Sequence, residues 1–388
     1  MQVIKAPREV LLKPLTIVGG IIDSHQTKNI LSNVLIKREG NDVSFTGTDL
    51  EIQIRTHIEN DVLETDPVSF TVSARKALDL FKVLPDTDVS LSLGEARKGI
   101  GAEGNNQISR KLEVKTISSR FSLQTLPAED YPDFPQTDYQ GKIILPANEF
   151  KYLLSMVHYA MAIQDIRFYL NALRLVVKNG KIRAVATDGR RLAFCERSLP
   201  ADAASQLSEG DVLAATIPRK TVTELKRLLP DTDAPVTIEF APKRARFTFD
   251  TIEISTKLLE GKYPDYERVI PTNNNKTFLI DREELLGALH RTAVFASDKF
   301  KGVRWLLSPG LLSIQSSNSE QEEGNDDLVI DYQDEPIDIG FNVNFLSDVL
   351  SNLKTDKIKV SLSGPQGSAL ISMPDNDSFK YVLMPMRL

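Results

Sequence analysis

The sequence is short of the residues on which several classes of protein depend. It has one cysteine, Cys195, in 388 residues, which excludes an internal disulfide and fits a reducing compartment. Cys195 lies in an alternating strand pattern with no neighbouring base evident, which predicts a buried structural thiol rather than a nucleophile. The four histidines, His25, His57, His158 and His290, have no metal-ligand spacing with it. We therefore expect isolated surface or capping histidines and no metal site.

Long apolar runs and nucleotide-binding loops are missing too. No segment approaches the ~18–20 apolar residues of a membrane span, and the start, Met1–Lys5, lacks the apolar core of a signal peptide. The glycines of Gly94–Gly104 lead into a strand without the Lys-Ser/Thr of a phosphate-binding loop, so a flexible loop is predicted there. These absences indicate a cytoplasmic protein without membrane contact and without a cofactor.

Overall charge limits how the chain can meet nucleic acid. The formal net charge is −6, with 41% hydrophobic and 26% charged residues, which is ordinary for a globular protein. That balance argues against a protein wrapped round nucleic acid over its whole surface. It allows one basic surface offset by acid elsewhere, because the distribution of charge decides binding.

One stretch of the sequence is repeated. Val72–Asp86 occurs again without a gap at Ile217–Asp231, and a fainter third copy runs from Phe341 to Leu353, with Asp348 at the acidic position. The copies lie much further apart than the roughly 20–50 residues of solenoid repeats. They therefore predict whole domains built on one plan.

Each copy has the pattern of a short amphipathic helix. Pro85 and Pro230 are predicted to end the first two helices. Their apolar positions follow the i, i+3, i+4 spacing and are predicted to face the core; they are Leu80, Val83 and Leu84, and Leu225, Leu228 and Leu229.

Basic residues on these helices project away from the apolar positions. A single copy would be interpreted as a solvated face, but repetition of the pattern favours a shared cationic surface. Such a surface contacts phosphates without reading bases. The helical basic residues are Arg75, Lys76, Lys82, Lys151, Arg219, Lys220, Lys226, Arg227 and Arg291.

Two similar proline-containing segments mark the domain boundaries. Leu126–Pro135 and Leu258–Tyr266 both contain Tyr-Pro-Asp, which places the boundaries near 137 and 271. The predicted domains are 1–137, 138–271 and 272–388, and each is expected to begin with a strand and a helix. These helices are predicted from Arg8 to about Val18, with Pro14 near the start or kinking it, from about Asn148 to Ala160, and from Arg282 to Phe295, with Asp281 as N-cap. Each domain is predicted to be α+β, with mostly antiparallel sheets and two helices on one face.

Carboxylates offer an alternative, enzymatic reading. Asp188 and Asp265 could form a metal-dependent site of an enzyme of DNA metabolism, but their motifs recur at Asp49 and Asp133, which favours a structural role. The acidic segment Ser319–Asp327 does not match a calcium loop and is interpreted as a solvated outer loop. The absence of a catalytic constellation favours a binding protein.

Several longer motifs carry a family resemblance over the whole chain. Thr-Gly-Thr-Asp-Leu-Glu occurs at 46–51, Ala-Thr-Asp-Gly-Arg-Arg-Leu-Ala at 186–193, Tyr-Pro-Asp-Tyr-x-Arg-Val at 263–269, and Val-x-Met-Pro-Met-Arg-Leu at the C-terminus. In these motifs the sequence resembles the bacterial DNA polymerase sliding clamp, the beta subunit of the polymerase III holoenzyme.

The resemblance implies a non-catalytic processivity factor that acts as a ring. Two copies would meet head to tail around double-stranded DNA, with helices lining the hole and sheets outside. The ring would slide without sequence preference and tether the polymerase catalytic subunit, the clamp loader and other proteins with a clamp-binding motif, including repair proteins. The ends that meet would lie around Phe121 and Leu123 and around Val294 and Phe295, although burial within their own domains is the alternative.

The resemblance also assigns two sets of residues. A pocket for an extended partner peptide maps to Leu170, Thr187, Gly189, Arg191, Leu192, Pro264, Arg268, Val269, Asn342, Phe345, Ser368, Val382, Met384, Pro385 and Met386. DNA contacts map to the hole-facing helices and to loops near His25, Gln164 and Tyr169. We expect deletion of Met384–Leu388 to abolish polymerase stimulation while leaving ring closure largely intact, although this segment could also be a strand that closes its domain.

The sequence departs from the family pattern at four places. His25 stands where arginine is frequent, which puts that DNA contact in doubt, and Phe345 stands where tyrosine is common, which removes a hydroxyl from the pocket rim. Asn344 replaces the basic residue of the other two copies, so the third domain should bind DNA least. Gly94–Gly104 is longer than expected and has no assigned function.

Overall fold

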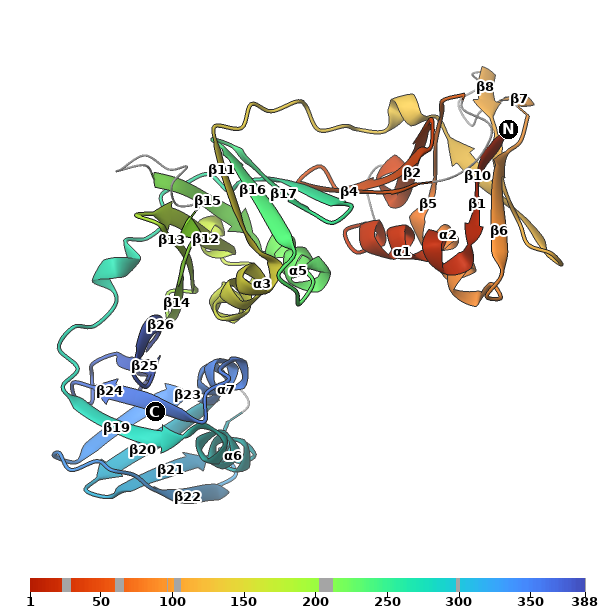
Figure 1. Ribbon diagram of the computed structural model, residues 1–388. Coiled ribbons are helices and arrows are strands. Elements are labelled where there is room, and N and C mark those ends of the chain that lie inside the picture. The colour runs from red at the N-terminus through yellow and green to blue at the C-terminus, as the bar shows by residue number, and fades with distance from the viewer. Residues whose placement is uncertain are drawn as a thin grey trace. The chain divides into compact units, whose positions relative to one another are not determined.

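The structure repeats one order of elements three times. It is a computed structural model describing residues 1–22, 29–59, 66–95, 97–100, 106–201, 212–297 and 301–387 (Figure 1). Among the described elements of Figure 1, each repeat has the order strand, helix, four strands, helix, three strands, and the first contains an extra hairpin. By contacts the chain divides into two compact units, Met1–Ala147 with Arg227–Leu258, and Asn148–Lys226 with Leu259–Leu388.

The first unit is built on a 12-stranded sheet whose pairs are all antiparallel, as predicted. Its strands, in spatial order, are β1 Gln2–Pro7, β6 Asp88–Leu93, β9 Lys111–Lys115, β10 Arg120–Leu126, β5 Val68–Ser73, β2 Asn33–Glu39, β3 Asp42–Thr48, β4 Ile52–Glu59, β18 Ile252–Lys257, β17 Arg244–Phe249, β16 Pro235–Ala241 and β11 Gly141–Pro146. Sheet pairing between β4 and β18 therefore joins the first repeat to the second.

The extra hairpin lies in the segment that was predicted to be a flexible loop. β7, Arg97–Ile100, pairs with β8, Asn106–Ser109. The loop prediction was wrong over Arg97–Ile100, because glycine content does not show that a partner strand follows; residues 96 and 101–105 lie outside the described part.

Two helices accompany this sheet. α1, Arg8–Gly19, packs beside α2, Ala74–Val83, and keeps Pro14 inside it rather than near its start. α2 ends before Pro85 as predicted. Its buried face was predicted in part: Leu84 is buried as predicted and Leu80 is half-buried, but Val83 is 79% exposed, and Ala77 and Phe81 are buried instead. A ten-residue helix holds two overlapping apolar stripes, and the larger Phe81 ring faces the core.

The second unit contains two antiparallel sheets. The eight-stranded sheet has the order β15 Val212–Pro218, β12 Ala172–Lys178, β13 Lys181–Thr187, β14 Arg191–Ser198, β26 Asn376–Leu383, β25 Ala369–Met373, β24 Lys357–Leu362 and β19 Lys276–Asp281. The four-stranded sheet has the order β22 Glu323–Val329, β21 Leu311–Ser317, β20 Gly302–Ser308 and β23 Ile337–Asn342. Pairing of β14 with β26 joins the second repeat to the third.

The other α-helices in the described residues are α3 Ala147–Ser155, α5 Arg219–Leu228, α6 Arg282–Ala293 and α7 Val343–Asn352. The short 3-10 helices are η1 Asn29–Ser32, η2 Ala128–Asp130, η3 His158–Ala160, η4 Phe168–Leu170 and η5 Tyr266–Arg268. The Asp281 carboxylate accepts from the Glu284 N–H, which confirms its predicted role as N-cap of α6. The helix expected from Asn148 to Ala160 was too long: α3 ends at Ser155 and the chain continues through η3.

The acidic segment Ser319–Asp327 is not simply a loop. Its second half belongs to β22, which pairs with β21 over its whole length. The loop prediction was wrong there because the partner strand, rather than composition, decides the backbone conformation. In the repeat order β22 takes the place of β4 and β14.

Both Tyr-Pro-Asp segments are anchored rather than loose. The Tyr131 hydroxyl donates to the Thr46 carbonyl at 3.2 Å, and the Tyr263 hydroxyl donates to the Val185 carbonyl at 3.3 Å. Both rings are buried, and their acceptors lie at corresponding positions of β3 and β13. The tyrosine thus fixes each segment to the repeat that it closes.

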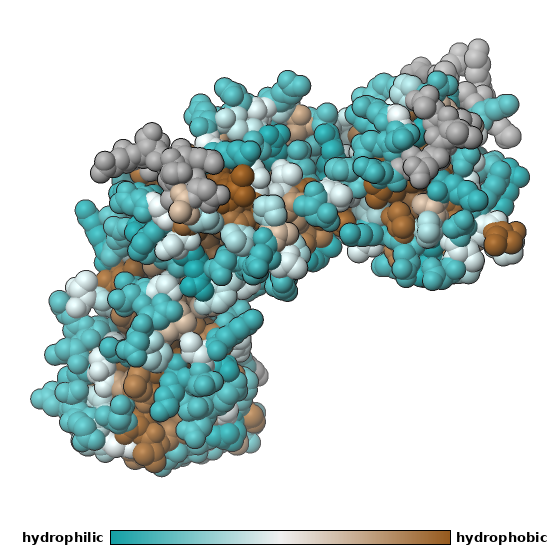
Figure 2. Space-filling model, viewed as in Figure 1, coloured by the Kyte–Doolittle hydropathy of each residue, from teal (hydrophilic) through white to brown (hydrophobic). Residues whose placement is uncertain are grey.

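Apolar side chains fill the layer between sheets and helices, while polar residues cover most of the face seen in Figure 2. Cys195 is fully buried in β14, and burial raises its thiol pKa to about 12, which confirms a structural cysteine. Across the described ranges, no helix is long and apolar enough to cross a membrane.

Candidate functional site

The residues assigned to the peptide pocket gather around the joint between β14 and β26; we call this region the predicted peptide site. It begins at the tight turn Thr187–Arg191. The Thr187 hydroxyl donates to the Arg191 carbonyl at 2.6 Å and accepts from the Gly189 N–H at 3.0 Å. The Asp188 carboxylate accepts from the Arg191 N–H at 3.0 Å. This turn delivers Arg191 to the first position of β14.

Arg191 links three elements of the second unit. Its guanidinium donates to Asp188 at 3.1 Å, to Asp348 of α7 at 2.6 Å and to the Tyr159 carbonyl of η3 at 2.7 Å. It also lies over the Phe345 ring, 4.2 Å from the centroid. Burial alone would lower the pKa of Arg191, but Tyr381 and Asp348 raise it above its usual value. A permanently charged side chain therefore fixes the site.

An apolar cluster lies beside this cation. Leu192 of β14 stands opposite Val382 of β26, and Leu170 is buried at the end of η4. The buried members of the cluster are Val185, Leu192, Phe194, Tyr263 and Val382, with Tyr266, Ile270 and Leu370 packed against them.

The rim of the predicted peptide site exposes apolar side chains. Met384 is 45% exposed and Val269 is 38% exposed. The Met384 N–H donates to the Arg190 carbonyl at 2.9 Å, so the backbone is held while the side chain stays accessible. A flexible thioether above a buried apolar cluster suits an apolar anchor of a partner.

Other assigned residues have structural partners in the same region. The Asn342 side chain caps α7 by accepting from the N–H groups of Asn344 and Phe345. The Ser368 carbonyl accepts from Asn274 at 2.8 Å. The assigned residues Pro264, Arg268 and Pro385 fall on the segments that carry Tyr263, Val269 and Met384.

Met386 also closes the last repeat. Its N–H donates to the Gly340 carbonyl at 2.9 Å, two residues before the Asn342 cap. At the corresponding place in the second repeat, the Leu259 N–H donates to the Thr216 carbonyl at 3.0 Å. Deletion of Met384–Leu388 would therefore remove a structural bridge as well as the exposed rim, so single substitutions are the sharper test.

The sequence did not identify several residues that build this site. Asp348 was singled out for its place in the repeat, not as a partner of Arg191. Tyr159 and Tyr381 belong to no motif that the sequence revealed. The Tyr159 carbonyl accepts from Arg191, and the Tyr381 hydroxyl donates to the Phe345 carbonyl at 2.9 Å. The interpretation of His158 as an isolated histidine was wrong, because it is half-buried against Lys226 of α5.

The cationic residues of the helices differ in exposure. Arg75, Lys76 and Lys82 are exposed on α2, and Arg75 pairs with Asp79 at 3.7 Å. On α5, Lys220 and Arg227 are exposed, whereas Arg219 and Lys226 are half-buried. Lys151, on α3, and Tyr169 are half-buried, and Gln164 is exposed. His25 lies outside the described residues.

The residues assigned to the dimer contact lie near strand edges. Phe121 on β10 is 38% exposed and Leu123 is half-buried. Val294, after α6, is 75% exposed, whereas the Phe295 ring packs against Gly324, where an added Cβ would come within 2.6 Å of it. Phe295 thus has contacts within its own repeat.

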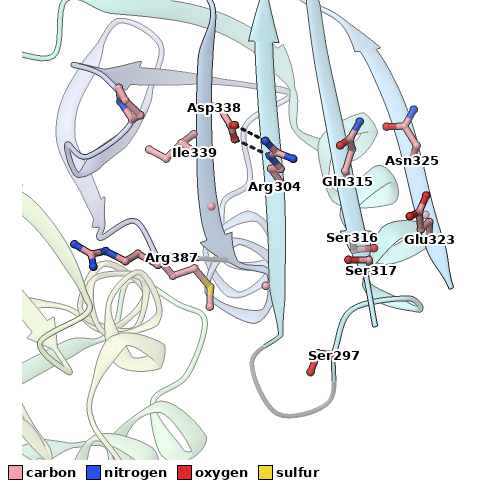
Figure 3. A pocket seen from close by; sticks show the side chains of 15 residues that line it. Ser297, Arg304, Gln315, Ser316, Ser317, Glu323, Asn325, Asp338, Ile339 and Arg387 are labelled. Atoms are coloured by element: carbon pink, nitrogen blue, oxygen red, sulfur yellow. Dashed lines mark hydrogen bonds and ion pairs between the residues drawn. The ribbon is translucent and has the colours of Figure 1, made fainter. Parts of the chain in front are cut away.

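A separate hollow of about 1210 Å³ lies in the last repeat (Figure 3). Its lining is mainly polar and includes Gln315, Asn325 and the Arg304–Asp338 ion pair, whose closer atoms are 2.5 Å apart. Among the residues assigned to the predicted peptide site, the lining includes Met386. The hollow is therefore distinct from the apolar cluster beside Arg191.

The carboxylates of the enzymatic alternative are engaged locally. Asp188 stabilises its turn, as Asp49 does by accepting from the Ile52 N–H at 2.9 Å. Asp265 pairs with Arg268 at 2.9 Å. Within the described residues, no group of three or more His, Cys, Asp or Glu side chains could hold a metal ion.

Comparison with known proteins accounts for all three repeats. The N-terminal, central and C-terminal domains of the DNA polymerase III beta subunit family match residues 3–135, 144–265 and 267–387. The Beta sliding clamp of Pseudomonas aeruginosa is 41% identical over 383 residues, covering 98% of each chain.

Solved structures agree over the full length. A crystal structure of the DNA polymerase sliding clamp from Pseudomonas aeruginosa with ligand has a TM-score of 0.90 and 38% identity, covering all of both chains. A structure of that organism's clamp bound to griselimycin gives the same values. The chain therefore belongs to the family of bacterial beta sliding clamps, the non-catalytic beta subunit of DNA polymerase III.

Proposed function

We propose that this clamp works as a cytoplasmic ring of two copies with two working surfaces. The domains are 1–137, 138–271 and 272–388. Helices α2 and α5 face duplex DNA in the hole, and the predicted peptide site holds partner proteins. The observation that carries the ring is the sheet joint, which occurs twice within the chain and whose third counterpart is not formed among the described strands.

The two joints use the same positions of the repeat. β4 pairs with β18, and β14 pairs with β26. In the third repeat the matching strand is β22, which ends its sheet among the described strands. In the first repeat the strand matching β18 and β26 is β10, whose pairing with β5 is confined to Thr125 and Leu126.

An open β22 edge and an open β10 edge are complementary halves of one further joint. A single chain offers one of each, so pairing with a second copy is head to tail, and a ring of two copies would use both edges of each chain. Unsatisfied strand edges otherwise invite uncontrolled association. Exposed Phe121 on β10 and exposed Val294 at the end of α6 support an apolar contribution to this joint.

The DNA surface rests on cations that a polyanion attracts without regard to sequence. Exposed Arg75, Lys76, Lys82 and Lys220 lie on matching helices of the first two repeats, whereas α7 carries Asn344 instead. Such contacts are individually weak and screened by salt. A closed ring makes weak contacts sufficient, because threading rather than affinity retains the DNA.

The predicted peptide site supplies the tether. A clamp with griselimycin bound is known in Pseudomonas aeruginosa, and we propose that griselimycin and the extended peptides of the polymerase catalytic subunit, the clamp loader and other partners bind here. Tethering raises the effective concentration of polymerase near the primer end. A methionine at the rim suits a site that accepts several partners.

Retention on DNA tests the ring. The protein is loaded by its clamp loader on nicked circular duplex, isolated, and the circle is then cut once. We expect retention on the circle, release after cutting, and a solution mass of two copies. Equal loss from cut and uncut DNA, or a monomer mass at micromolar concentration, would overturn the proposal.

A further inference from the structure

The η3 segment, His158–Ala160, is held by cations from two different sources. It lies against β13 and β14, the strands that lead into and out of the turn Thr187–Arg191. From the predicted peptide site, Arg191 donates to the Tyr159 carbonyl at 2.7 Å. From α5, Lys226 and Arg219 reach the same short stretch of chain. The segment therefore contacts residues assigned to both working surfaces.

The contacts from α5 are specific. The Lys226 ammonium lies 2.7 Å from His158 Nε2 and 3.0 Å from His158 Nδ1, so it rests against the imidazole ring, and the Arg219 guanidinium donates to the Met161 carbonyl at 3.0 Å. His158 Nδ1 lies 3.1 Å from the Ser155 carbonyl, at the end of α3. A neutral imidazole can donate from Nδ1 to the Ser155 carbonyl while the Lys226 ammonium rests against its ring, whereas a protonated ring would repel that ammonium. The two α5 cations therefore fix both ends of η3.

The electrostatics agree with this geometry. Burial, and then the nearby charge of Lys226, lowers the pKa of His158 to about 4, so the ring is neutral beside the ammonium. Burial, and then Lys151, lowers the pKa of Lys226 to about 8. Lys226 is thus partly desolvated by its contact with η3, unlike the exposed Lys82 of α2.

The Tyr159 carbonyl is the point where these contacts affect the predicted peptide site. Arg191 keeps its position over Phe345 while it donates to Asp348 and to that carbonyl. A shift of η3 moves one of the three acceptors of a buried guanidinium. Because an unmatched buried charge is costly, Arg191 and the ring beneath it would follow.

We propose that Lys226 and Arg219 are positioning residues for the predicted peptide site, and that DNA which engages them weakens peptide binding. The inference rests on the proposed function, in which α5 faces DNA. Phosphates compete with His158 and the Met161 carbonyl for the two cations. η3 then loses support, and the site binds a partner less tightly. By thermodynamic linkage, a bound partner weakens DNA binding by the same factor.

The test measures griselimycin affinity with and without DNA. The full-length protein is titrated with griselimycin alone and with duplex DNA at a concentration that saturates each variant. For the natural sequence we expect DNA to weaken griselimycin binding about fivefold, at the low end of measured couplings between sites. Griselimycin should weaken DNA binding by the same factor.

Two variants isolate the η3 contact. Lys226→Met and His158→Phe each remove one side of it and keep the side-chain volume close. Each should weaken griselimycin binding about threefold without DNA, which is within the range seen for residues that act through others. In both, DNA should no longer change griselimycin affinity, and the double variant should resemble either single one.

Lys82→Met is the matched control, because it removes one cation from the corresponding helix of the first repeat. It should lower DNA affinity while keeping the fivefold effect of saturating DNA on griselimycin. A DNA effect in Lys226→Met as large as in the natural sequence would overturn the inference, as would natural protein that binds both ligands independently. Failure of the natural protein to bind griselimycin or DNA at all would instead overturn the proposed function.

Discussion

The two sheet joints of this clamp share one construction and differ at one decisive position. In each, a Thr-Asp turn leads into the joining strand, with the threonine hydroxyl donating back to the first strand residue, at 2.9 Å from Thr48 and 2.6 Å from Thr187. That first residue is Ile52 in the β4–β18 joint and Arg191 in the β14–β26 joint. Both side chains are buried.

The difference shows how a structural joint becomes a binding site. Ile52 adds apolar area to a joint whose centre pairs Ile54 with Ile254. Arg191 instead reaches Asp348 and η3 and supports the Phe345 ring. A buried aliphatic side chain finishes the first joint, whereas a buried cation ties the second to two further elements and leaves Met384 exposed beside them.

Exchanging the decisive residue should break the first joint, and this is the largest expected effect. Ile52→Arg places a cation in a buried position where the natural side chain is aliphatic. Removing a charge from water without a partner costs several kcal/mol, so we expect a loss of about 4 kcal/mol in unfolding free energy. Urea unfolding followed by circular dichroism measures it.

Leu50→Arg, two residues earlier in the same turn and already partly exposed, is the control. It should cost less than about 1 kcal/mol, because a surface side chain keeps its charge in water. Equal losses from the two variants would show that the turn, and not burial at the joint, sets the cost.

The reverse exchange should destabilise the second joint less but weaken ligand binding there. Arg191→Ile leaves the Tyr159 carbonyl and Asp188 without this donor, while Asp348 is partly exposed and can be hydrated. We expect a loss of about 2–3 kcal/mol in unfolding free energy and at least a tenfold loss in griselimycin affinity. Urea unfolding and calorimetric titration provide the two readouts.

A stability control for that exchange is Arg268→Ile. The Arg268 side chain is largely exposed and pairs only with exposed Asp265 in the described structure, so its loss should change unfolding free energy by less than about 0.5 kcal/mol. If Arg191→Ile bound griselimycin with unchanged affinity, the role of the buried cation in the second joint would be refuted.

Sequence alone predicted what depends on local pattern. The repeated plan, the helix ends before Pro85 and Pro230 and the Asp281 cap follow from residues close together in the chain. The sequence did not predict that the acidic segment forms β22, or the full set of buried residues of α2, because partner strands and tertiary packing decide these features. The cation network around Arg191 joins residues far apart in sequence, and no motif records that Asp348 or His158 would meet it.

The smallest expected effect is a pH dependence of the unfolding free energy. It comes from His158 in η3, the segment that packs against β14 of the second joint. Because burial and Lys226 hold the pKa of His158 at about 4, the folded protein resists the proton that an unfolded chain binds below about 6.5. Unfolding free energy should therefore fall as pH drops from 6.5 to 4 and be unaffected by this group above 6.5. Since His158 is partly exposed, we expect about 1 kcal/mol over that range.

Comparison of variants separates this effect from the carboxylates that titrate in the same range. In urea unfolding at pH 7 and pH 5, His158→Phe should show a shallower loss of stability than the natural sequence, whereas His57→Phe, at an exposed position of β4 in the first joint, should show the natural slope. Matching slopes for all three proteins would mean that His158 is protonated in the folded state at pH 5. A protonated ring would repel the Lys226 ammonium, and the support that α5 gives to η3 would then depend on Arg219 alone.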